Sequence, residues 1–350
     1  MTPLLSKINQ IGLFLLLTHL CIGSASARAG EAQDLLAQAF SAYQEQQWTS
    51  AIAPLERALA LYPGYAEAHH LLGLILNNLE QPDKAIMELQ RAVEAYPQFA
   101  QAYVDLGFIY QEQAQFPKAE QSLNLALKSY PKFLEARIAL AAFYDQQQQA
   151  QKAIQAHQVV LELDPHRVDS LYGVAFWLVQ EQKPAEAQRY VDQLVSLHPT
   201  YINGWLMAGS LAQQSGQVDK AIQAYQQVVS LNNNLVDPYF HLGVLYRQKE
   251  AYQEAAQAFE DVTKLDKNNA EAHVNLGVVY AALSKIDQAE EEYRTALALN
   301  PQLAEVHYNL GLLYEFHRNA PQQALKYYEE YVRLGGQDGR IQALLKRTKS

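Results

Sequence analysis

Three histidines share one position of a repeating pattern, and their chemistry is the first question that this sequence raises. His69, His273 and His307 are separated by multiples of 34 residues. Imidazole nitrogens are common metal ligands, and His273 and His307 would lie in neighbouring units. The same position carries Tyr103 and Trp205 in other units, so the sequence favours histidines that pack between helices. We therefore expect no metal site and no other cofactor.

Acidic and amide side chains form two further candidate sites, and both are incomplete. The acidic run 290–292 falls within one expected helix, whereas a calcium site needs ligands from a tight loop. Asn275 and Asn309 share a repeat position and would begin an asparagine ladder that binds a peptide backbone. The same position holds Leu71 and Ala139 in other units, so the ladder is not continued.

The pattern behind these comparisons is a 34-residue repeat, which indicates a stack of identical supersecondary units. Alanine returns at Ala51, Ala85, Ala119, Ala153, Ala187, Ala221, Ala255 and Ala289. A small residue stands twelve residues before this repeat position in the second to ninth units, at Gly73, Gly107, Ala141, Ala175, Gly209, Gly243, Gly277 and Gly311. Proline stands twelve residues after it, at Pro63, Pro97, Pro131, Pro165, Pro199 and Pro301, and is replaced by Asn233 and Lys267 in two units.

Each of these positions has a physical reason in a pair of antiparallel helices. Glycine inside a helix costs about 1 kcal/mol relative to alanine, so its recurrence indicates a close crossing that admits no larger side chain. The alanine fits the facing helix at that crossing. Proline cannot continue a helix and ends the second one. Each unit therefore contains a first helix, helix A, and a second, helix B.

This spacing resembles the tetratricopeptide repeat. The third unit carries the family's pattern at Tyr103, Leu106, Gly107, Tyr110, Ala119, Leu123, Ala126 and Pro131. The resemblance implies an all-α fold, a right-handed α-solenoid (superhelix) of nine helix-turn-helix units. The expected units are 32–65, 66–99, 100–133, 134–167, 168–201, 202–235, 236–269, 270–303 and 304–337. The ninth is one residue longer, since its alanine is Ala324 where the strict period gives Gln323.

The first 27 residues differ from the repeats and are typical of a secretion signal. Lys7 precedes an apolar run at 11–22, and Ala25-Ser26-Ala27 follows as a cleavage site. We expect cleavage after Ala27 and export to a bacterial periplasm, with an uncleaved membrane anchor as the alternative. The single cysteine, Cys21, would leave with this segment, so the mature chain would hold no disulfide and no cysteine nucleophile.

The charge balance is acidic and argues against a phosphate-binding surface. The whole chain carries a net charge of −10, and cleavage after Ala27 would remove one lysine. Nucleic acid is therefore not an expected partner. Only the segment 338–350 is basic, and a short helix from about Gly339 to Arg347 is expected to cap the last unit with a polar outer face.

The sequence predicts no enzyme. The leader, nine units and the terminal helix account for the 350 residues, so no stretch is left for a catalytic domain. A regular solenoid presents a groove rather than a pocket that excludes water and positions a nucleophile with a base. No catalytic residue is therefore predicted.

The resemblance implies instead that helix A lines a concave, peptide-binding face. Its fifth and ninth positions are mainly apolar and lie on one side of the helix, which makes a stripe in addition to the core positions. Amides at the twelfth position would pair with a peptide backbone. The expected groove residues are His70, Leu74, Val104, Phe108, Gln111, Ile138, Tyr172, Phe176, Leu206, Phe240, Arg247, Val274, Tyr308 and Leu312.

The flanks of this stripe indicate the chemistry of the partner. The second position of helix A is mostly acidic, as at Asp237, Glu271 and Glu305, and the family's lysines for acidic C-terminal peptides are missing. We expect a protein or peptide segment that is apolar and possibly basic. The expected role is a scaffold or adaptor in envelope complex assembly. A carrier or co-chaperone for an unfolded or lipidated client, and an accessory subunit of a glycosyltransferase or peptidase, remain alternatives.

Overall fold

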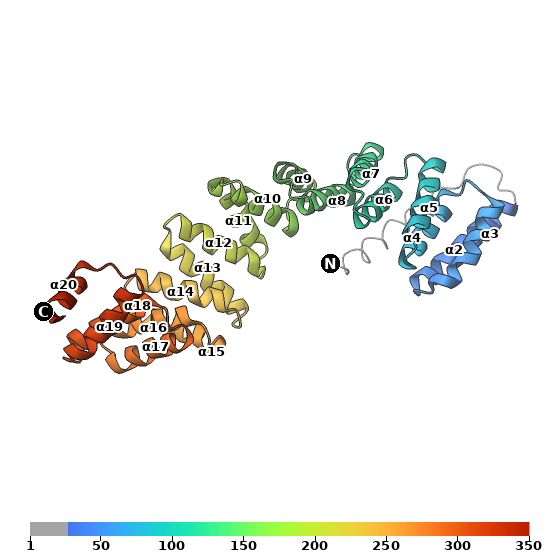
Figure 1. Cartoon of the computed structure of the whole chain (residues 1–350). Coiled ribbons are helices and arrows are strands. Elements are labelled where there is room, and N and C mark those ends of the chain that lie inside the picture. Colours follow the sequence, from blue (N-terminus) through green and yellow to red (C-terminus); the bar gives the residue numbers. More distant parts are fainter. Residues whose placement is uncertain (1–26, 350) are drawn as a thin grey trace. The chain divides into compact units, whose positions relative to one another are not determined.

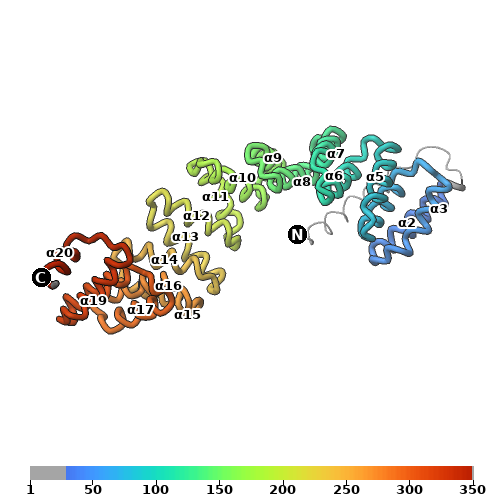
Figure 2. The backbone as a smooth tube through the Cα atoms, in the orientation of Figure 1, coloured from blue at the N-terminus to red at the C-terminus, as the bar shows by residue number. Residues whose placement is uncertain are grey.

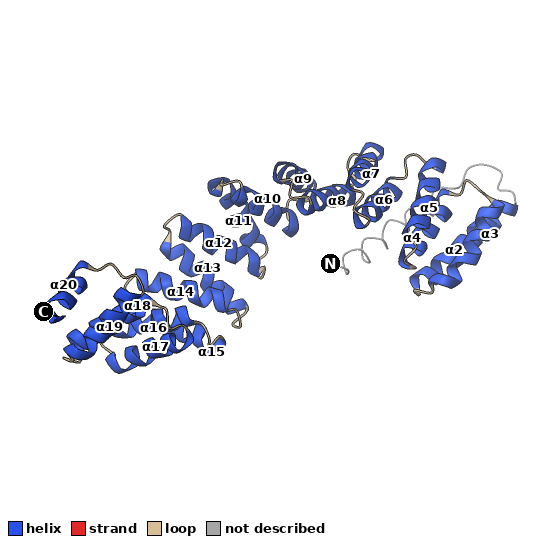
Figure 3. Ribbon diagram, viewed as in Figure 1, coloured by secondary structure: helices blue, strands red, loops and turns tan. Residues whose placement is uncertain are grey.

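The computed structural model describes residues 27–349, and in this part of the chain helices are joined by short turns, with no strand (Figures 1 and 3). Helices A and B alternate along the backbone trace (Figure 2), which confirms the expected α-solenoid of helix-turn-helix repeats. The chain divides into two compact units, residues 1–190 and 191–350. They are called unit 1 and unit 2 below and are described separately. The expected signal segment lies outside the described residues, apart from Ala27.

Unit 1 contains the helix pairs of the first half of the chain. The division at Tyr190 falls inside α11, the helix that connects the two units. The helices are α2 (Ala27–Gln44), α3 (Trp48–Leu61), α4 (Ala66–Asn78), α5 (Pro82–Ala95), α6 (Ala100–Glu112), α7 (Phe116–Ser129), α8 (Leu134–Gln146), α9 (Ala150–Leu163), α10 (Val168–Gln180) and α11 (Pro184–Leu197).

Unit 2 continues the same alternation and ends in an additional short helix. This last helix corresponds to the terminal helix expected from about Gly339 to Arg347. The helices are α12 (Ile202–Gln214), α13 (Val218–Leu231), α14 (Val236–Gln248), α15 (Tyr252–Leu265), α16 (Ala270–Ala282), α17 (Ile286–Leu299), α18 (Ala304–Leu312), η2 (Leu313–His317), α19 (Pro321–Arg333) and α20 (Gly339–Lys349).

The recurring small residues are needed because helices A and B cross closely. A Cβ atom at Gly73 would lie 2.7 Å from the side chain of Leu89, and at Gly277 it would lie 2.6 Å from the ring of Tyr293. The alanines of helix B, such as Ala85 and Ala289, are fully buried. The glycine positions thus let large helix B side chains fill the space between the two helices.

Each turn from helix A to helix B contains one residue in the left-handed backbone region, where a Cβ atom is sterically unfavourable. Only one of the nine is glycine, and the eight others have φ between 52° and 59°. The nine residues are Gln46, Glu80, Ala114, Gln148, Gln182, Gly216, Glu250, Ser284 and Asn319.

The extra residue of the ninth unit is taken up in its first helix. α16 has 13 residues, whereas α18 has 9 and continues directly into the five-residue π-helix η2. A π-helical turn holds one more residue than an α-helical turn, so it absorbs the insertion without breaking the helix. The left-handed turn residue consequently moves from the strict repeat position to Asn319.

The terminal helix α20 packs on the end of unit 2. Ile341 and Leu345 are buried against the same core as Tyr314 and Tyr328. The Arg340 side chain donates hydrogen bonds to Glu315 at 3.0 Å. Lys346 and Arg347 are exposed, so the outer surface of the last helix is polar. Among the described residues, no helix has both the length and the apolar character needed to cross a membrane.

Candidate functional site

Four of the expected groove residues are buried in the core. The side chains of His70, Leu74, Val104 and Val274 are between 0% and 7% exposed. Successive A helices contact one another directly, as α4 does α6 and α14 does α16, so these side chains lie between helices. This corrects the sequence-based set, because a side chain enclosed in this way cannot contact a partner unless the helices separate.

The other expected residues of unit 1 are half-buried. Tyr172 and Phe176 stack on one another along α10, with ring centroids 6.2 Å apart. Gln111 on α6 donates a side-chain hydrogen bond to Gln146 on α8, which links the twelfth position of one A helix to the thirteenth of the next. Phe108 and Ile138 are half-buried on α6 and α8.

Unit 2 contains a comparable set of half-buried residues from the expected groove. Phe240 on α14 packs its ring against the buried Phe259, with centroids 5.7 Å apart, and Tyr308 on α18 packs against Tyr331 at 5.3 Å. The remaining half-buried members are Leu206, Arg247 and Leu312. The ten half-buried residues are called the helix A row, which is described for each unit by itself. Its members in unit 1 are Phe108, Gln111, Ile138, Tyr172 and Phe176, and its members in unit 2 are Leu206, Phe240, Arg247, Tyr308 and Leu312.

Carboxylates border the row in unit 2. Asp237, Glu271 and Glu305 occupy the second position of α14, α16 and α18, and all three are exposed. Carboxylates in the first turn also stabilise a helix through its dipole, so their position has a structural reason of its own. Within the described residues, none of the three forms an ion pair with a lysine or arginine.

The repeated histidines hydrogen-bond to the turn that precedes their helix. The ring Nε2 of His69, His273 and His307 lies 3.0–3.2 Å from the carbonyl oxygen six residues earlier. Arg137 and Trp205, at the same repeat position, donate to the equivalent carbonyl at 3.0 and 2.9 Å. In these five units the position therefore supplies a side-chain N–H donor to the preceding turn. Among residues 27–349, no three histidine, cysteine or acidic side chains converge as a metal site.

The second ring nitrogen of His69 faces a carboxylate, which sets its protonation. Nδ1 lies 2.6 Å from Glu88, and both side chains are largely buried. Burial by itself would lower the pKa of His69, but the hydrogen bonds with Glu88 and the Pro63 carbonyl outweigh burial and raise it. His69 is thus held toward its charged form by local structural contacts.

A polar cluster inside unit 1 was not anticipated from the sequence. His157 on α9 is 4% exposed, with Nε2 2.9 Å from Asp145 and Nδ1 3.2 Å from Ser170. Trp177 donates to the other oxygen of Asp145 at 2.6 Å. The cluster connects α8, α9 and α10. Ser170 is 2% exposed, so the arrangement holds helices together and leaves its hydroxyl closed to a substrate.

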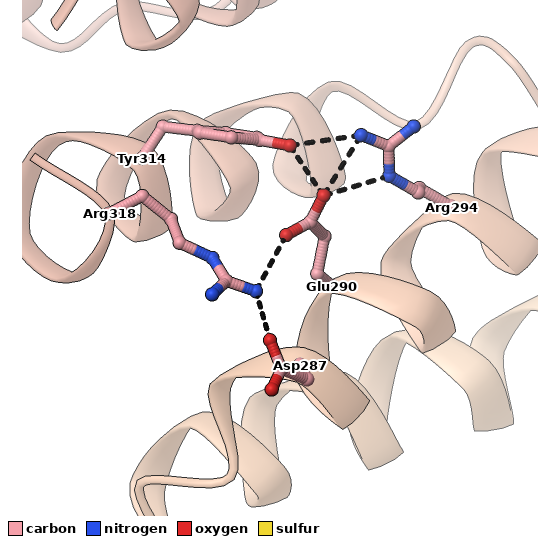
Figure 4. A network of polar contacts seen from close by, with 5 residues as sticks. All are labelled: Asp287, Glu290, Arg294, Tyr314 and Arg318. Carbon is pink, nitrogen blue, oxygen red and sulfur yellow. Dashed lines mark hydrogen bonds and ion pairs between the residues drawn. The ribbon is translucent and has the colours of Figure 1, made fainter. Parts of the chain in front are cut away.

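A charged network joins α17 to the end of the next A helix (Figure 4). Glu290 accepts hydrogen bonds from Arg294 at 3.0 Å, from Arg318 at 3.2 Å and from Tyr314. Arg318 also pairs with Asp287. Asp287, Glu290, Arg294 and Arg318 line a surface pocket of about 430 Å³. Burial would raise the pKa of Glu290, but the three hydrogen bonds outweigh it and lower the pKa.

Sequence profiles of known families match most of the repeat region. The profile described as the tetratricopeptide repeat protein 21 C-terminal ARM domain matches residues 128–275. Profiles described as tetratricopeptide repeat match residues 36–100 and 79–141, and one described as TPR repeat matches residues 279–315. No curated protein matches the chain.

Solved structures with a similar fold include several bacterial repeat proteins. The C-terminal part of a TPR repeat-containing protein from Cytophaga hutchinsonii is 14% identical, with a TM-score of 0.60, and the match covers 69% of this chain and 99% of that chain. PilF of Pseudomonas aeruginosa is 20% identical, with a TM-score of 0.49 and coverage of 65% and 99%. MamA of Desulfovibrio magneticus is 18% identical, with a TM-score of 0.45 and coverage of 48% and 94%. At 14% identity the likeness to the Cytophaga hutchinsonii protein concerns the fold alone, and it agrees with the profiles that this chain carries tetratricopeptide repeats.

Proposed function

We propose that the protein is a non-enzymatic scaffold that holds a peptide segment of a partner protein against its helix A row. Tetratricopeptide repeats generally serve as non-catalytic surfaces for protein interaction. The observation that carries the proposal is the partial exposure of large apolar side chains on helix A, above all Tyr172, Phe176 and Phe240. Aromatic side chains of this kind are common anchors of protein interfaces.

The expected partner segment is apolar on one side and basic on the other. The exposed carboxylates Asp237, Glu271 and Glu305 border the row in unit 2 and would attract cationic side chains. The acidic net charge of the chain supports the same direction of attraction. The amide of Gln111 would contribute hydrogen bonds to a peptide backbone.

We place the protein in a bacterial cell envelope, where it would support the assembly of a complex. The support for this place is the signal-like segment of residues 1–27, with its basic start, apolar run and Ala-Ser-Ala site. The mass of the mature N-terminus would decide between cleavage after Ala27 and retention as an anchor.

The proposal is tested by replacing Tyr172, Phe176 and Phe240 with alanine and purifying the protein from its native envelope. A partner that co-purifies with the wild type should be lost, while circular dichroism shows unchanged helix content. Capture at the wild-type level by the triple variant would contradict the proposal. Rapid release of the partner by a short competing peptide would indicate a carrier rather than a stable scaffold.

A further inference from the structure

Arg137 occupies a repeat position at which two other units hold a histidine–glutamate pair. It is the fourth residue of α8, and the fourth residues of α4 and α16 are His69 and His273. Nδ1 of His69 lies 2.6 Å from Glu88, and Nδ1 of His273 lies 2.5 Å from Glu292, each on the following B helix. Within the described residues Arg137 forms no ion pair, so it differs from the two histidines in lacking a carboxylate partner.

Alanine stands where the missing carboxylate would be. Glu88 and Glu292 follow their histidines by 19 residues, and the residue 19 positions after Arg137 is Ala156 on α9. All three positions lie three residues after the repeated alanine of their B helix. Because the glutamate is absent, this repeat lacks both its negative charge and the volume of its side chain.

Arg137 and Ala156 both line a surface pocket of about 360 Å³, to which α7, α8 and α9 contribute. It is called the Ala156 pocket. Its apolar lining consists of four half-buried side chains: Leu127, Leu140, Ala156 and Val159. Pockets that bind small molecules commonly join apolar walls to a few charged or polar groups that fix the orientation of the ligand. The Ala156 pocket has this composition.

The charge of the Ala156 pocket favours an anionic ligand. Its lining includes Arg137 and Lys152 and, among the described residues, no carboxylate. Lys152 pairs at 3.0 Å with Glu120, which lies outside the lining. Arg137 uses Nε and Nη2 for the carbonyl of the preceding turn, so the N–H groups of Nη1 are left to donate to a ligand. A carboxylate bound there would complete the pair that the other two repeats make internally.

We propose that the Ala156 pocket binds a medium-chain fatty acid, whose carboxylate takes the place of the missing glutamate. The carboxylate accepts hydrogen bonds from Arg137, and the alkyl chain packs on Leu127, Leu140 and Val159, where its burial from water is favourable. A peptide C-terminus would bring a backbone amide against these aliphatic side chains, which offer it no hydrogen bond. The lining therefore favours an alkyl carboxylate over the end of a polypeptide.

The test is isothermal titration of octanoate into the full chain at pH 7. We expect saturable binding, with affinities at least tenfold lower for octanol, which lacks the charge, and for acetate, which lacks the chain. Arg137→Gln should lower the affinity for octanoate at least tenfold. Ala156→Glu should abolish binding, because it supplies the carboxylate internally and fills the pocket. Two other repeats carry glutamate at this position, so the fold of this variant should be kept, and circular dichroism checks it.

A matched control removes an arginine from the corresponding pocket two repeats earlier. Arg91 lines that pocket together with His69 and Glu94, and Arg91→Gln should leave the affinity for octanoate unchanged. The inference is overturned if the wild type does not bind octanoate, or binds octanol equally well. Wild-type affinity in the Arg137→Gln or Ala156→Glu variant would overturn it as well. Tighter binding of acetyl-glycyl-leucine than of octanoate would assign the pocket to a peptide C-terminus and reject the fatty acid.

Discussion

At the scale of single residues, several side chains that the sequence offers as candidate metal ligands have a structural role in the fold. Residues as different as histidine, arginine and tryptophan share the fourth position of helix A because each offers an N–H to the preceding turn. The sequence analysis correctly favoured a structural role for these histidines. It could not identify the role, since the accepting carbonyl lies six residues away in a turn whose path is set by packing.

The hydrogen bond from the fourth position of helix A to the preceding turn gives the first prediction. Trp205→Phe removes the hydrogen bond to the Pro199 carbonyl and should lower the free energy of unfolding by about 0.5–1.5 kcal/mol. Chemical denaturation followed by circular dichroism measures the change. Tyr103→Phe is the control, because Tyr103 shares the position and makes no such bond within the described residues. Equal effects of the two substitutions would show that the donor is not what stabilises the turn.

The Glu290 network gives a prediction about pH. Because its pKa in the folded protein lies below the ordinary value of 4.5, the network stabilises the fold above that pH. The stabilisation is lost as the pH falls through the folded pKa. Glu290→Gln should therefore lower the melting temperature at pH 7, and the difference between the two proteins should shrink as the pH falls below 4.5. A difference between the two proteins that grows toward acid pH would contradict this assignment.

At the scale of the helices, the sequence placed the close crossings at the repeated glycines but not the turns. The 34-residue spacing of glycine and alanine located the helix A and helix B contacts, because close packing admits few residue types there. The left-handed turn residues were missed, since Gly216 is the only glycine among the nine. The surface was also incompletely predicted: direct contact between successive A helices encloses His70, Leu74, Val104 and Val274.

The turns give a prediction of increased stability. Ala114 has φ of 56°, so Ala114→Gly should relieve backbone strain and raise the free energy of unfolding by about 0.5–1 kcal/mol. Thermal unfolding checks the direction. Ala60 is exposed within α3, where the same change to glycine should destabilise by about 1 kcal/mol. Loss of stability in both variants would mean that the turn is not strained.

The helix crossings give the opposite expectation for glycine. Gly277→Ala would place a Cβ atom 2.6 Å from the ring of Tyr293, which must move. We expect a loss of about 1–3 kcal/mol, as is usual for overpacked cores. Gly64→Ala meets no atom within 4 Å and should change stability much less. An unchanged free energy of unfolding in the Gly277→Ala variant would show that the crossing accommodates an additional methyl group.

At the scale of the whole molecule, each unit is a stack of hairpins whose stability comes from contacts between neighbours. The sequence predicted the repeat architecture because period and residue type are set by packing. It located the candidate surface only in part, because the solvent exposure of a side chain depends on how closely neighbouring repeats pack.

Site-specific photo-crosslinking in the native envelope tests the central claim most directly. A photoreactive phenylalanine analogue is placed at Phe176 or Phe240 in the helix A row, and at exposed helix B positions Gln121 or Gln223 as controls. The account predicts a discrete crosslinked polypeptide from Phe176 and Phe240 and none from the two glutamine positions. Crosslinks from the helix B positions alone, or equal yields at all four, would contradict a partner that binds along helix A.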